Sequence, residues 1–293
     1  MILKVIHRTV YQYRCLVELH PHRLFVTPRS QHGLKILHNE LTCNSSGDIS
    51  SADDVFGNIV TSVSFADPTC YLEIENSIIA EQRADPWPLF DIAPFAHNFP
   101  FAYRDDEATD LGALCCPAYR DSESRLMNWS KAFVLSDQTD TLDLLKAMSA
   151  SIESLITYQQ RDEEGTQSPA QTLGQSSGSC RDITTLFIEA ARHLGFGARA
   201  VSGYRFDDGF EADGESEKAS KLGEGSTHAW AEIYLPGAGW IAFDPTHDRV
   251  GNASLIAVAV ARDISQILPV VGRYVGEPDD FIEMSVKVGV TKM

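Results

Sequence analysis

Long apolar runs, basic residues and closely paired cysteines are all scarce in this chain of 293 residues. No stretch approaches the ~18 uninterrupted apolar residues of a membrane-spanning helix, and the first twenty residues lack the apolar centre of a signal peptide. Basic residues number 24 against 41 acidic ones, which gives a net charge of −17. Phosphate backbones and anionic lipids repel such a surface. We therefore expect a cytoplasmic protein that binds neither nucleic acid nor membranes.

Metal and cofactor motifs are also missing. The six cysteines form no CxxC pair, which disfavours a structural zinc site. The phosphate-binding GxxxxGK[ST] and GxGxxG patterns and an EF-hand loop are absent as well, so we expect no organic cofactor and no calcium. Without a signal peptide the thiols should stay reduced. We predict that all but Cys180 are small, mostly buried hydrophobic residues: Cys15, Cys43, Cys70, Cys115 and Cys116.

The first part of the chain predicts β-structure. Hydrophobic residues make up 43% and charged residues 22%, so wholesale disorder is excluded. Short runs rich in β-branched and aromatic residues, at 5–13, 34–41 and 59–65, are separated by turn-forming clusters. We predict an all-β, sandwich-like domain over residues 1–83. Five prolines between residues 86 and 117 then predict an irregular, proline-rich connector over residues 84–139.

Residues 140–293 are predicted to form an α+β catalytic domain. Apolar residues at helical spacing indicate a helix over 141–158, capped by Asp140 or Thr141. A polar loop follows over 161–177, and a second amphipathic helix begins at Cys180 and ends at Gly195. Strands are expected at 199–206, 228–235 and 240–244.

Three residues of this domain have the kinds of side chain that catalysis by a thiol requires. Cys180 stands in the first turn of its helix, where unpaired N–H groups and the helix dipole favour a thiolate and can hold an oxyanion. His228 opens a strand, and Asp244 closes the next one. A thiolate, an imidazole that shares its proton and a group that orients the imidazole form a catalytic triad. The sequence therefore predicts that Cys180, His228 and Asp244 are catalytic.

Four blocks of residues resemble a known family. They are Gly-Ser-Cys-Arg-Asp at 178–182, Gly-Tyr at 203–204, His-Ala-Trp-Ala-Glu at 228–232 and Gly-Trp-Ile-Ala-Phe-Asp-Pro-Thr at 239–246. In this order they resemble the transglutaminase-like superfamily, and in particular a bacterial branch with an N-terminal β domain whose members are often described as cysteine proteases. Residues 54–58 and 258–263 also look like that branch, apart from Ala261, where the branch has glycine. The resemblance implies a papain-like core with Cys180 as nucleophile, His228 as base and acid, and Asp244 as the orienting residue.

The predicted reaction is acyl transfer from an amide in a protein or peptide substrate. If water accepts the acyl group the protein is a peptidase or amidase, and if an amine accepts it the protein is a transglutaminase. The alternative is a catalytically silent binding or scaffolding module. Asp182 and Arg181, beside the nucleophile, either take part in the site or act as a cap and an ion pair that stabilise the helix start.

Other polar and aromatic residues near the triad leave alternatives open. Trp230 and Trp240 either line a substrate groove or pack in the core. His247, three residues after Asp244, is interpreted as a loop histidine; a metal site built from His228, Asp244 and His247 is its rival. The acidic, glycine-rich residues 206–227 predict a mobile surface loop at the rim of the site, either as a lid or as an inert insertion.

Strand parity adds a geometric prediction. A hairpin with the four-residue loop 236–239 would turn Asp244 to the face opposite His228. A five-residue loop, 235–239, pairs Tyr234 with Trp240 and leaves Asp244 on the His228 face. We therefore predict an odd-numbered loop or a β-bulge, with Asp244 hydrogen-bonded to a ring nitrogen of His228.

Overall fold

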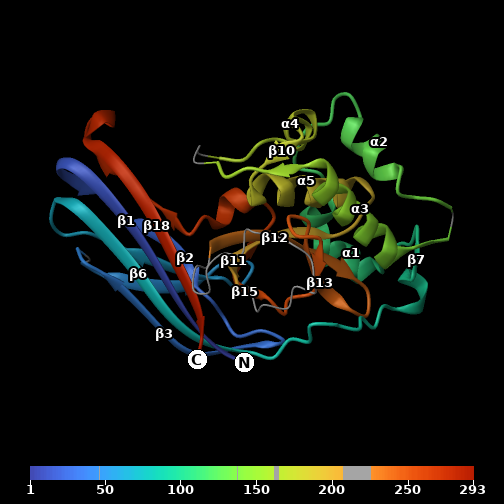
Figure 1. Ribbon diagram of the computed structural model, residues 1–293, viewed down its shortest axis with the longest axis horizontal. Helices are drawn as coiled ribbons and strands as arrows, with labels where there is room; N and C mark the ends of the chain where they lie inside the picture. Colours follow the sequence, from blue (N-terminus) through green and yellow to red (C-terminus); the bar gives the residue numbers. More distant parts are fainter. Residues whose placement is uncertain (46, 137, 162–164, 207–225) are drawn as a thin grey trace, which may run out of the picture.

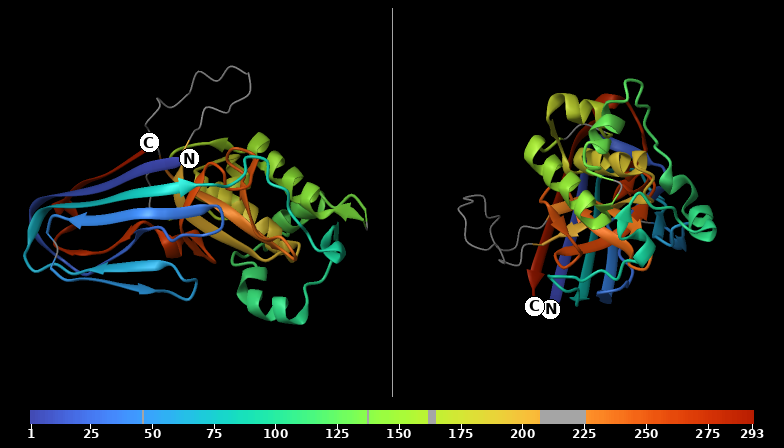
Figure 2. Two further views of the ribbon diagram at one scale, coloured as in Figure 1. Left: turned by 90° about the horizontal axis from the view of Figure 1, so that it is seen from below. Right: turned by 90° about the vertical axis from the view of Figure 1, so that its right-hand side faces the viewer.

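The computed structural model describes residues 1–45, 47–136, 138–161, 165–206 and 226–293. Figure 1 shows a β-sandwich on one side and, on the other, a third sheet with most of the helices. The two views of Figure 2 show the same arrangement from below and from the side of the helices. The mixed α and β content and the β-rich N-terminal region confirm the predicted fold class.

Two antiparallel sheets form the sandwich. One has the strand order β17-β1-β6-β3, with β18 also paired to β1, and the other has the order β16-β2-β5-β4. Burial alternates strictly along most of β6, as expected for a strand with one face in a core. The strands are β1 (Ile2–Leu19), β2 (His22–Thr27), β3 (Leu34–Cys43), β4 (Ile49–Asp53), β5 (Ile59–Val63), β6 (Thr69–Gln82), β16 (Val270–Val271), β17 (Tyr274–Val275) and β18 (Phe281–Lys292).

The C-terminal strands belong to the N-terminal sandwich. β18 runs antiparallel to β1 from the pair Leu3–Lys292 to the pair Tyr13–Phe281, so the two ends of the chain lie side by side in Figure 1. β16 pairs with β2, and β17 pairs with β1. The prediction had assigned all of 140–293 to the catalytic domain, and the strand pairing instead places residues 270–292 in the sandwich.

Residues 84–139 are more ordered than the irregular connector that the prolines predict. They form the helices α1 (Asp105–Leu111) and α2 (Arg125–Lys131), the 3₁₀ turns η1 (Pro94–Ala96) and η2 (Gly112–Cys115), and the short strands β7 (Asn98–Phe99) and β8 (Thr139–Asp140). A buried carboxylate fastens this segment to the core. Glu189 accepts backbone hydrogen bonds from Ala118 and Tyr119 and forms an ion pair with Arg192 at 2.7 Å. Such a buried charge requires this degree of pairing.

The third sheet is antiparallel, with the order β14-β13-β12-β11-β15. Its strands are β11 (Ala198–Arg205), β12 (Ser226–Leu235), β13 (Gly239–Asp244), β14 (Arg249–Val250) and β15 (Leu255–Ala261). Helix α5 (Cys180–His193) packs on β12 and β11, and helices α3 (Thr141–Leu155) and α4 (Pro169–Gln175) pack against α5. The remaining elements are β9 (Thr157–Tyr158), β10 (Ser177–Gly178), η3 (Ile264–Ile267) and η4 (Pro278–Asp280).

The helix predictions are confirmed at their starts. The Asp140 carboxylate accepts a hydrogen bond from the backbone of Asp143 at the start of α3, and α5 begins at Cys180. Gly195 has the positive φ of 89° that ends a helix at glycine. The predicted polar loop 161–177 contains α4, which the sequence analysis missed. Ser168 caps α4, and Pro169 occupies its first position, which is a recognisable helix-start signal.

The hairpin between β12 and β13 has the predicted register. Tyr234 pairs with Trp240, and Leu235 pairs with Gly239, which leaves the odd-numbered loop 236–238. Gly237 has a φ of 85°, a conformation that suits glycine. Because the loop has an odd number of residues, the side chain of Asp244 lies on the same face of the sheet as that of His228.

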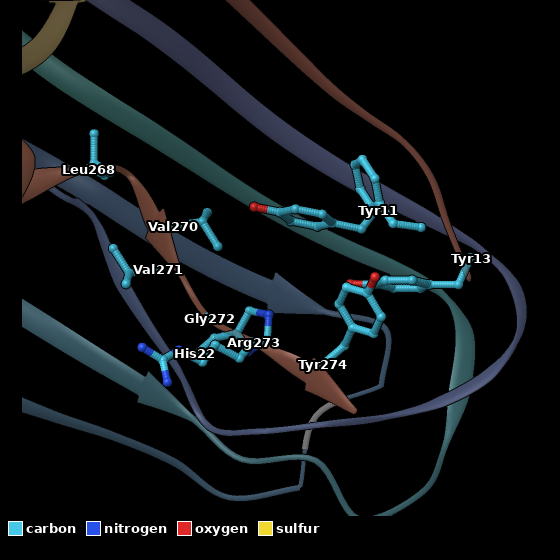
Figure 3. A pocket seen from close by; sticks show the side chains of 10 residues that line it. Tyr11, Tyr13, His22, Leu268, Val270, Val271, Gly272, Arg273 and Tyr274 are labelled. Atoms are coloured by element: carbon cyan, nitrogen blue, oxygen red, sulfur yellow. The ribbon is translucent and has the colours of Figure 1, made fainter. Parts of the chain in front are cut away.

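One hydrophobic core extends through both parts of the molecule. It joins buried residues of α3, α5 and the third sheet to Leu3 and Val5 of β1 and Phe25 of β2. A second cluster fills the distal part of the sandwich, beside a cavity of about 250 Å³ that is shown in Figure 3. Tyrosine rings from β1 and β17 line that cavity, and none of its lining residues belongs to the third sheet. Among the described residues, none of the helices has the length and apolar composition needed to cross a membrane.

Candidate active site

Backbone and side-chain contacts hold Cys180 at the start of α5. The carboxylate of Asp182, which is fully buried, accepts hydrogen bonds from the backbone N–H and the hydroxyl of Ser179, both at 2.8 Å. A Cβ on Gly178 would lie 2.9 Å from that of Asp182, so only glycine lets the chain pass this closely. The hydroxyl of Thr184 donates to the carbonyl oxygen of Ala229 at 2.9 Å and so ties the first turns of α5 to β12 beside His228.

Asp182 also holds the segment that precedes α4. Its carboxylate forms a two-pronged contact with Arg161, with both oxygens 2.9 Å from Nη1, and accepts the backbone N–H of Gln167 at 2.7 Å. The pKa of Asp182 is lowered: burial opposes ionisation, but these hydrogen bonds outweigh it. Asp182 is thus the predicted cap, and its ion-pair partner is Arg161. Arg181 contacts the carbonyl oxygen of Arg161 instead.

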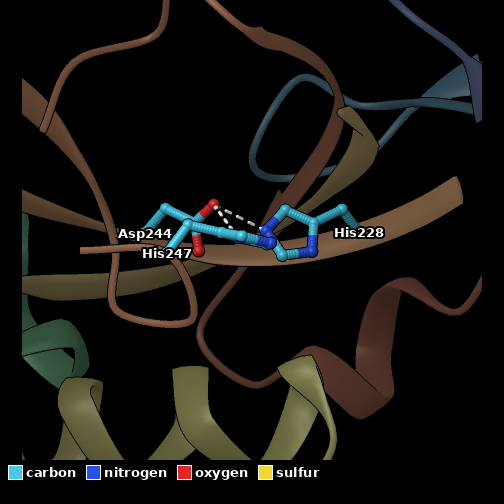
Figure 4. Close-up of side chains that lie close together, drawn as sticks. All are labelled: His228, Asp244 and His247. Carbon is cyan, nitrogen blue, oxygen red and sulfur yellow. Dashed lines mark hydrogen bonds and ion pairs between the residues drawn. The ribbon is translucent and has the colours of Figure 1, made fainter. Parts of the chain in front are cut away.

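His228 and Asp244 form the predicted hydrogen bond. Nε2 of His228 donates to Oδ2 of Asp244 at 2.8 Å, and both side chains are buried (Figure 4). The second oxygen of Asp244, Oδ1, accepts the backbone N–H of Thr246 at 3.1 Å. Because Nε2 is occupied by Asp244, Nδ1 is the ring nitrogen of His228 that is left for a hydrogen bond with Cys180.

The ionisation of the three residues is strongly coupled. Burial alone would lower the pKa of His228, but the charge and hydrogen bond of Asp244, together with Cys180, raise it to about 9. Burial likewise opposes a thiolate at Cys180, but the hydrogen bond and charge of His228 lower the pKa of the thiol. The pKa of Asp244 is lowered well below its ordinary range by His228, and also by His247, against the effect of burial. At neutral pH these directions favour a thiolate–imidazolium pair beside an ionised Asp244.

His247 is more than the loop histidine that the sequence suggested. Its Nδ1 lies 3.0 Å from Oδ2 of Asp244, and its ring centre is 5.2 Å from that of His228 (Figure 4). The sequence carries the signal, because an Asp-Pro pair starts a tight turn that brings the fourth residue back to the first. The ligand atoms of His228, Asp244 and His247 all lie within 4.8 Å of one another. The dashed lines of Figure 4 converge on one oxygen, so a metal ion would have to displace both hydrogen bonds.

The two candidate substrate-binding tryptophans have different surroundings. Trp230 is 1% exposed and packs in a cluster with Val201 and Ala257, behind the ring of His228, at a centroid distance of 6.1 Å. Its burial assigns it to the core and not to a substrate groove. Trp240 is four residues from Asp244 along β13 and stacks under the guanidinium of Arg199 at 4.0 Å.

The N-terminal region contributes to the wall behind the site. Phe56, from the turn between β4 and β5, packs against the buried cluster that contains Trp230. Trp230 in turn stacks on His228, with the two rings inclined by 25°. The orientation of His228 therefore depends on packing that both parts of the chain supply.

Tyr158 is a neighbour of Cys180 that the sequence analysis did not single out. It lies in β9, whose parallel pairing places Tyr158 opposite Gly178, and it is 54% exposed. Burial and then the charge of Cys180 raise the pKa of the Tyr158 hydroxyl. An exposed aromatic ring beside the thiol is suited to contacting a bound substrate. Residues 207–225, which make up most of the predicted rim loop, lie outside the described residues.

The other cysteines differ from the prediction. Cys15, Cys70 and Cys116 are exposed, and Cys43 and Cys115 are only half-buried. They lie at the surface of the sandwich and of the segment before α2, where strand and turn positions need no buried apolar side chain. The expectation that these five are mostly buried was therefore wrong.

Two family models match separate parts of this chain. The model of the transglutaminase-like superfamily matches residues 128–245, and the model of the bacterial transglutaminase-like N-terminal region matches residues 3–81. The chain belongs to the transglutaminase-like superfamily and has the N-terminal region of its bacterial branch. The first match contains all three predicted triad residues.

Relatives with similar length are known from mycobacteria. An uncharacterized protein of Mycobacterium tuberculosis is 26% identical over 296 residues, which covers 97% of this chain and 91% of the relative. An uncharacterized protein of Mycobacterium leprae is 24% identical, with 98% of each chain covered. Among solved structures, "a Putative Cysteine Protease from Cytophaga hutchinsonii" superimposes with a TM-score of 0.73 over 100% of this chain and 91% of that one, at 18% identity. This likeness shows that the two chains share a fold.

Proposed function

We propose that this protein is a cysteine-dependent acyltransferase that acts on amide bonds. In this proposal Cys180 is the nucleophile, His228 is the general base and acid, and Asp244 orients the imidazole. The observation that carries the proposal is the 2.8 Å hydrogen bond between Nε2 of His228 and Oδ2 of Asp244, which leaves Nδ1 for a thiol at a helix N-terminus. This is the arrangement of donors and acceptors that thiol catalysis requires.

The reaction proceeds in two stages. The Cys180 thiolate attacks the amide carbonyl, and the resulting oxyanion is stabilised by N–H groups at the start of α5. The C–N bond then breaks, the imidazolium of His228 gives its proton to the departing amine, and a thioester remains on Cys180. In the second stage neutral His228 takes a proton from the acceptor, which attacks the thioester; the C–S bond breaks and the Cys180 thiolate leaves, which restores the thiolate–imidazolium pair.

The acceptor decides the type of enzyme. Water as acceptor gives a carboxylic acid, which makes the protein a peptidase or amidase. A primary amine gives a new amide, which makes it a transglutaminase. The same three residues serve both reactions, and we propose a protein or peptide as the substrate in either case. Peptide-library cleavage and the incorporation of a labelled amine into proteins distinguish the two.

A silent binding or scaffolding module is the second candidate. Such a module needs neither the ion pair that lowers the pKa of Cys180 nor the buried carboxylate behind His228. Burying Asp244 and His228 costs free energy that only specific pairing recovers. This cost favours the catalytic proposal.

The proposal is tested by alkylation with iodoacetamide at pH 6, followed by peptide mapping. At this pH an ordinary thiol is almost fully protonated, whereas a thiol paired with an imidazolium reacts as the thiolate. We expect Cys180 to react at least about tenfold faster than the exposed Cys15, Cys70 and Cys116, which serve as internal standards.

Two variants complete the test. His228→Ala should bring the rate at Cys180 down to that of the standards. His32→Ala, at an exposed position in the sandwich, is the matched control and should leave the rate unchanged. Equal labelling of all six cysteines in the unmodified protein would refute the catalytic proposal.

A further inference from the structure

Two histidines share one oxygen of Asp244. His228 donates to Oδ2 at 2.8 Å from β12, and His247 donates to the same atom at 3.0 Å from the turn that follows β13. The turn is held by a hydrogen bond from the backbone N–H of His247 to the carbonyl oxygen of Asp244 at 3.2 Å. The backbone of this turn therefore brings the side chain of His247 close to the carboxylate of Asp244.

The two hydrogen bonds affect one another. A carboxylate oxygen can accept more than one hydrogen bond, but each donor draws electron density away from the other. The bond from His247 makes Asp244 a weaker acceptor for His228 than a carboxylate with a single imidazole partner. Any positive charge on His247 adds to this effect, because the two imidazole rings are 5.2 Å apart.

We propose that His247 is a positioning residue that limits the hold of Asp244 on His228 by sharing its acceptor oxygen. The inference rests on the proposed function, in which His228 must first hold a proton and then release it to the departing amine. An imidazolium bound too tightly by Asp244 keeps its proton and slows that release. His247 keeps the imidazolium acidic enough for the transfer while the carboxylate remains ionised.

The residues around His228 and His247 define which charges act on these two side chains. His228 faces Asp244 on one side and Cys180 on the other, and Arg181 lies near the thiol. His247 faces Asp244 and His228, and a third of its side chain is exposed to solvent. Asp248 and Arg249 follow it in the chain, and Arg249 pairs with Asp244 in the strand register. Replacing His247 therefore changes one of the two donors on Oδ2 and leaves the hydrogen bond of His228 in place.

The experiment compares the pH profile of Cys180 alkylation between pH 4 and pH 10 in three proteins. These are the unmodified chain, His247→Ala, which removes the donor, and His247→Asn, whose side-chain N–H can replace it. In each protein the rate of Cys180 alkylation should change in one step at high pH, where His228 loses its proton. We expect His247→Ala to move this step upward by about one pH unit, a typical size for the effect of a neighbouring group. His247→Asn should restore most of the original position.

A second readout does not require a reactive thiol. The proton on Nε2 of His228 gives a resonance in the ¹H NMR spectrum that moves downfield as its hydrogen bond to Asp244 strengthens. We expect a downfield shift in His247→Ala and a return toward the original position in His247→Asn. Asp248→Asn, in the same turn, is the control and should change neither readout.

The outcomes separate the two hypotheses. If Cys180 is selectively alkylated in the unmodified chain but the high-pH step and the resonance stay in place in folded His247→Ala, the role of His247 is refuted and the proposed function stands. If Cys180 reacts no faster than the exposed cysteines, the proposed function is refuted. In that case a downfield shift in His247→Ala still supports the sharing of Asp244, and an unchanged resonance overturns it. Should His247→Ala fail to fold, His247→Leu, which also lacks a side-chain N–H donor, takes its place.

Discussion

The side-chain amide of Asn58 binds both backbone groups of Val260. Its Nδ2 donates to the carbonyl oxygen of Val260 at 2.7 Å, and the N–H of Val260 donates to its Oδ1 at 2.8 Å. Val260 lies in β15, an edge strand of the third sheet, and Asn58 lies in the N-terminal region 202 residues earlier. The amide thus replaces a strand neighbour at the edge of β15 that pairs with no other strand among the described residues, close to the cluster that supports Trp230.

Removing this amide should destabilise the whole molecule. Asn58→Ala leaves a buried N–H and a buried carbonyl without partners, which costs about 1–3 kcal/mol for each unsatisfied group. We expect the free energy of unfolding in urea to fall by about 2–6 kcal/mol. Asn44→Ala is the matched control: its amide also binds strand backbone, at Tyr71 and Glu73, but in contact with water. A loss of the same size in both variants would contradict this account.

Gly203 should not tolerate any side chain. It pairs with His228 in the sheet, and a Cβ there would lie 2.2 Å from the carbonyl oxygen of Ile256 and 2.8 Å from the ring of Trp230. Gly203→Ala should therefore cost at least about 1–3 kcal/mol of unfolding free energy and reduce the alkylation rate of Cys180, because Trp230 stacks on His228. Gly174→Ala, in α4 with open space around it, should instead stabilise the protein by about 0.4–1 kcal/mol. Thermal and urea unfolding of both variants measure the contrast.

The charge of Asp244 should be needed for the thiolate. Asp244→Asn keeps a similar shape but removes the negative charge that raises the pKa of His228. The pKa of His228 should then fall and that of Cys180 should rise. Each unit reduces the thiolate fraction about tenfold, so we expect alkylation at pH 6 to slow by about tenfold or more. The difference in ultraviolet absorbance between each protein and its Cys180→Ser form follows the thiolate directly.

Asp248→Asn makes the same chemical change four residues later. Asp248 is exposed and has a φ of 46°, which asparagine accepts as readily as aspartate. The titration of the Cys180 thiolate in Asp248→Asn should match that in the unmodified chain. Equal effects of the two substitutions would mean that general charge, and not the contact with His228, controls Cys180.

His7 should make the protein sensitive to acid. It is buried between Tyr204, whose hydroxyl lies 2.9 Å from Nδ1, and Thr9, and burial lowers its pKa to about 4. Between pH 6.5 and pH 4 the unfolded chain binds a proton at this residue that the folded chain does not, so stability falls as the pH falls. The contribution of His7 to the slope of the unfolding free energy against pH approaches about 1.4 kcal/mol per pH unit. Urea unfolding at pH 7, 6 and 5 should show a shallower slope for His7→Gln, whereas His20→Gln, at an exposed position, should keep it.

Local sequence patterns predicted the elements that hold the three residues proposed as catalytic. The start of α5 at Cys180 follows from helix periodicity and from the glycine before it. The face of Asp244 follows from counting residues through the hairpin, because side chains alternate strictly along strands. These features depend only on residues that are close to one another in the sequence, so one sequence is enough to predict them.

Long-range features escaped the same reasoning. The alternating residues of 281–292 indicate a strand, but nothing local shows that its partner is β1, nearly the whole chain away. The placement of Phe56 behind Trp230 and of Tyr158 beside Gly178 depends likewise on how separate elements pack. The contact between His247 and Asp244 differs from these, because the Asp-Pro turn made it accessible to prediction.

The pairing of β18 with β1 sets the order in which the molecule can be completed during synthesis. β1 is made first, yet one of its two long neighbours consists of residues 281–292. Until those residues have been made, β1 presents an open row of backbone hydrogen-bonding groups, the kind of edge through which nascent chains associate with one another. The third sheet is finished earlier, since its last strand ends at Ala261. The strands that carry the residues proposed for chemistry are thus made before β18, and the newly made chain is vulnerable along the open edge of β1.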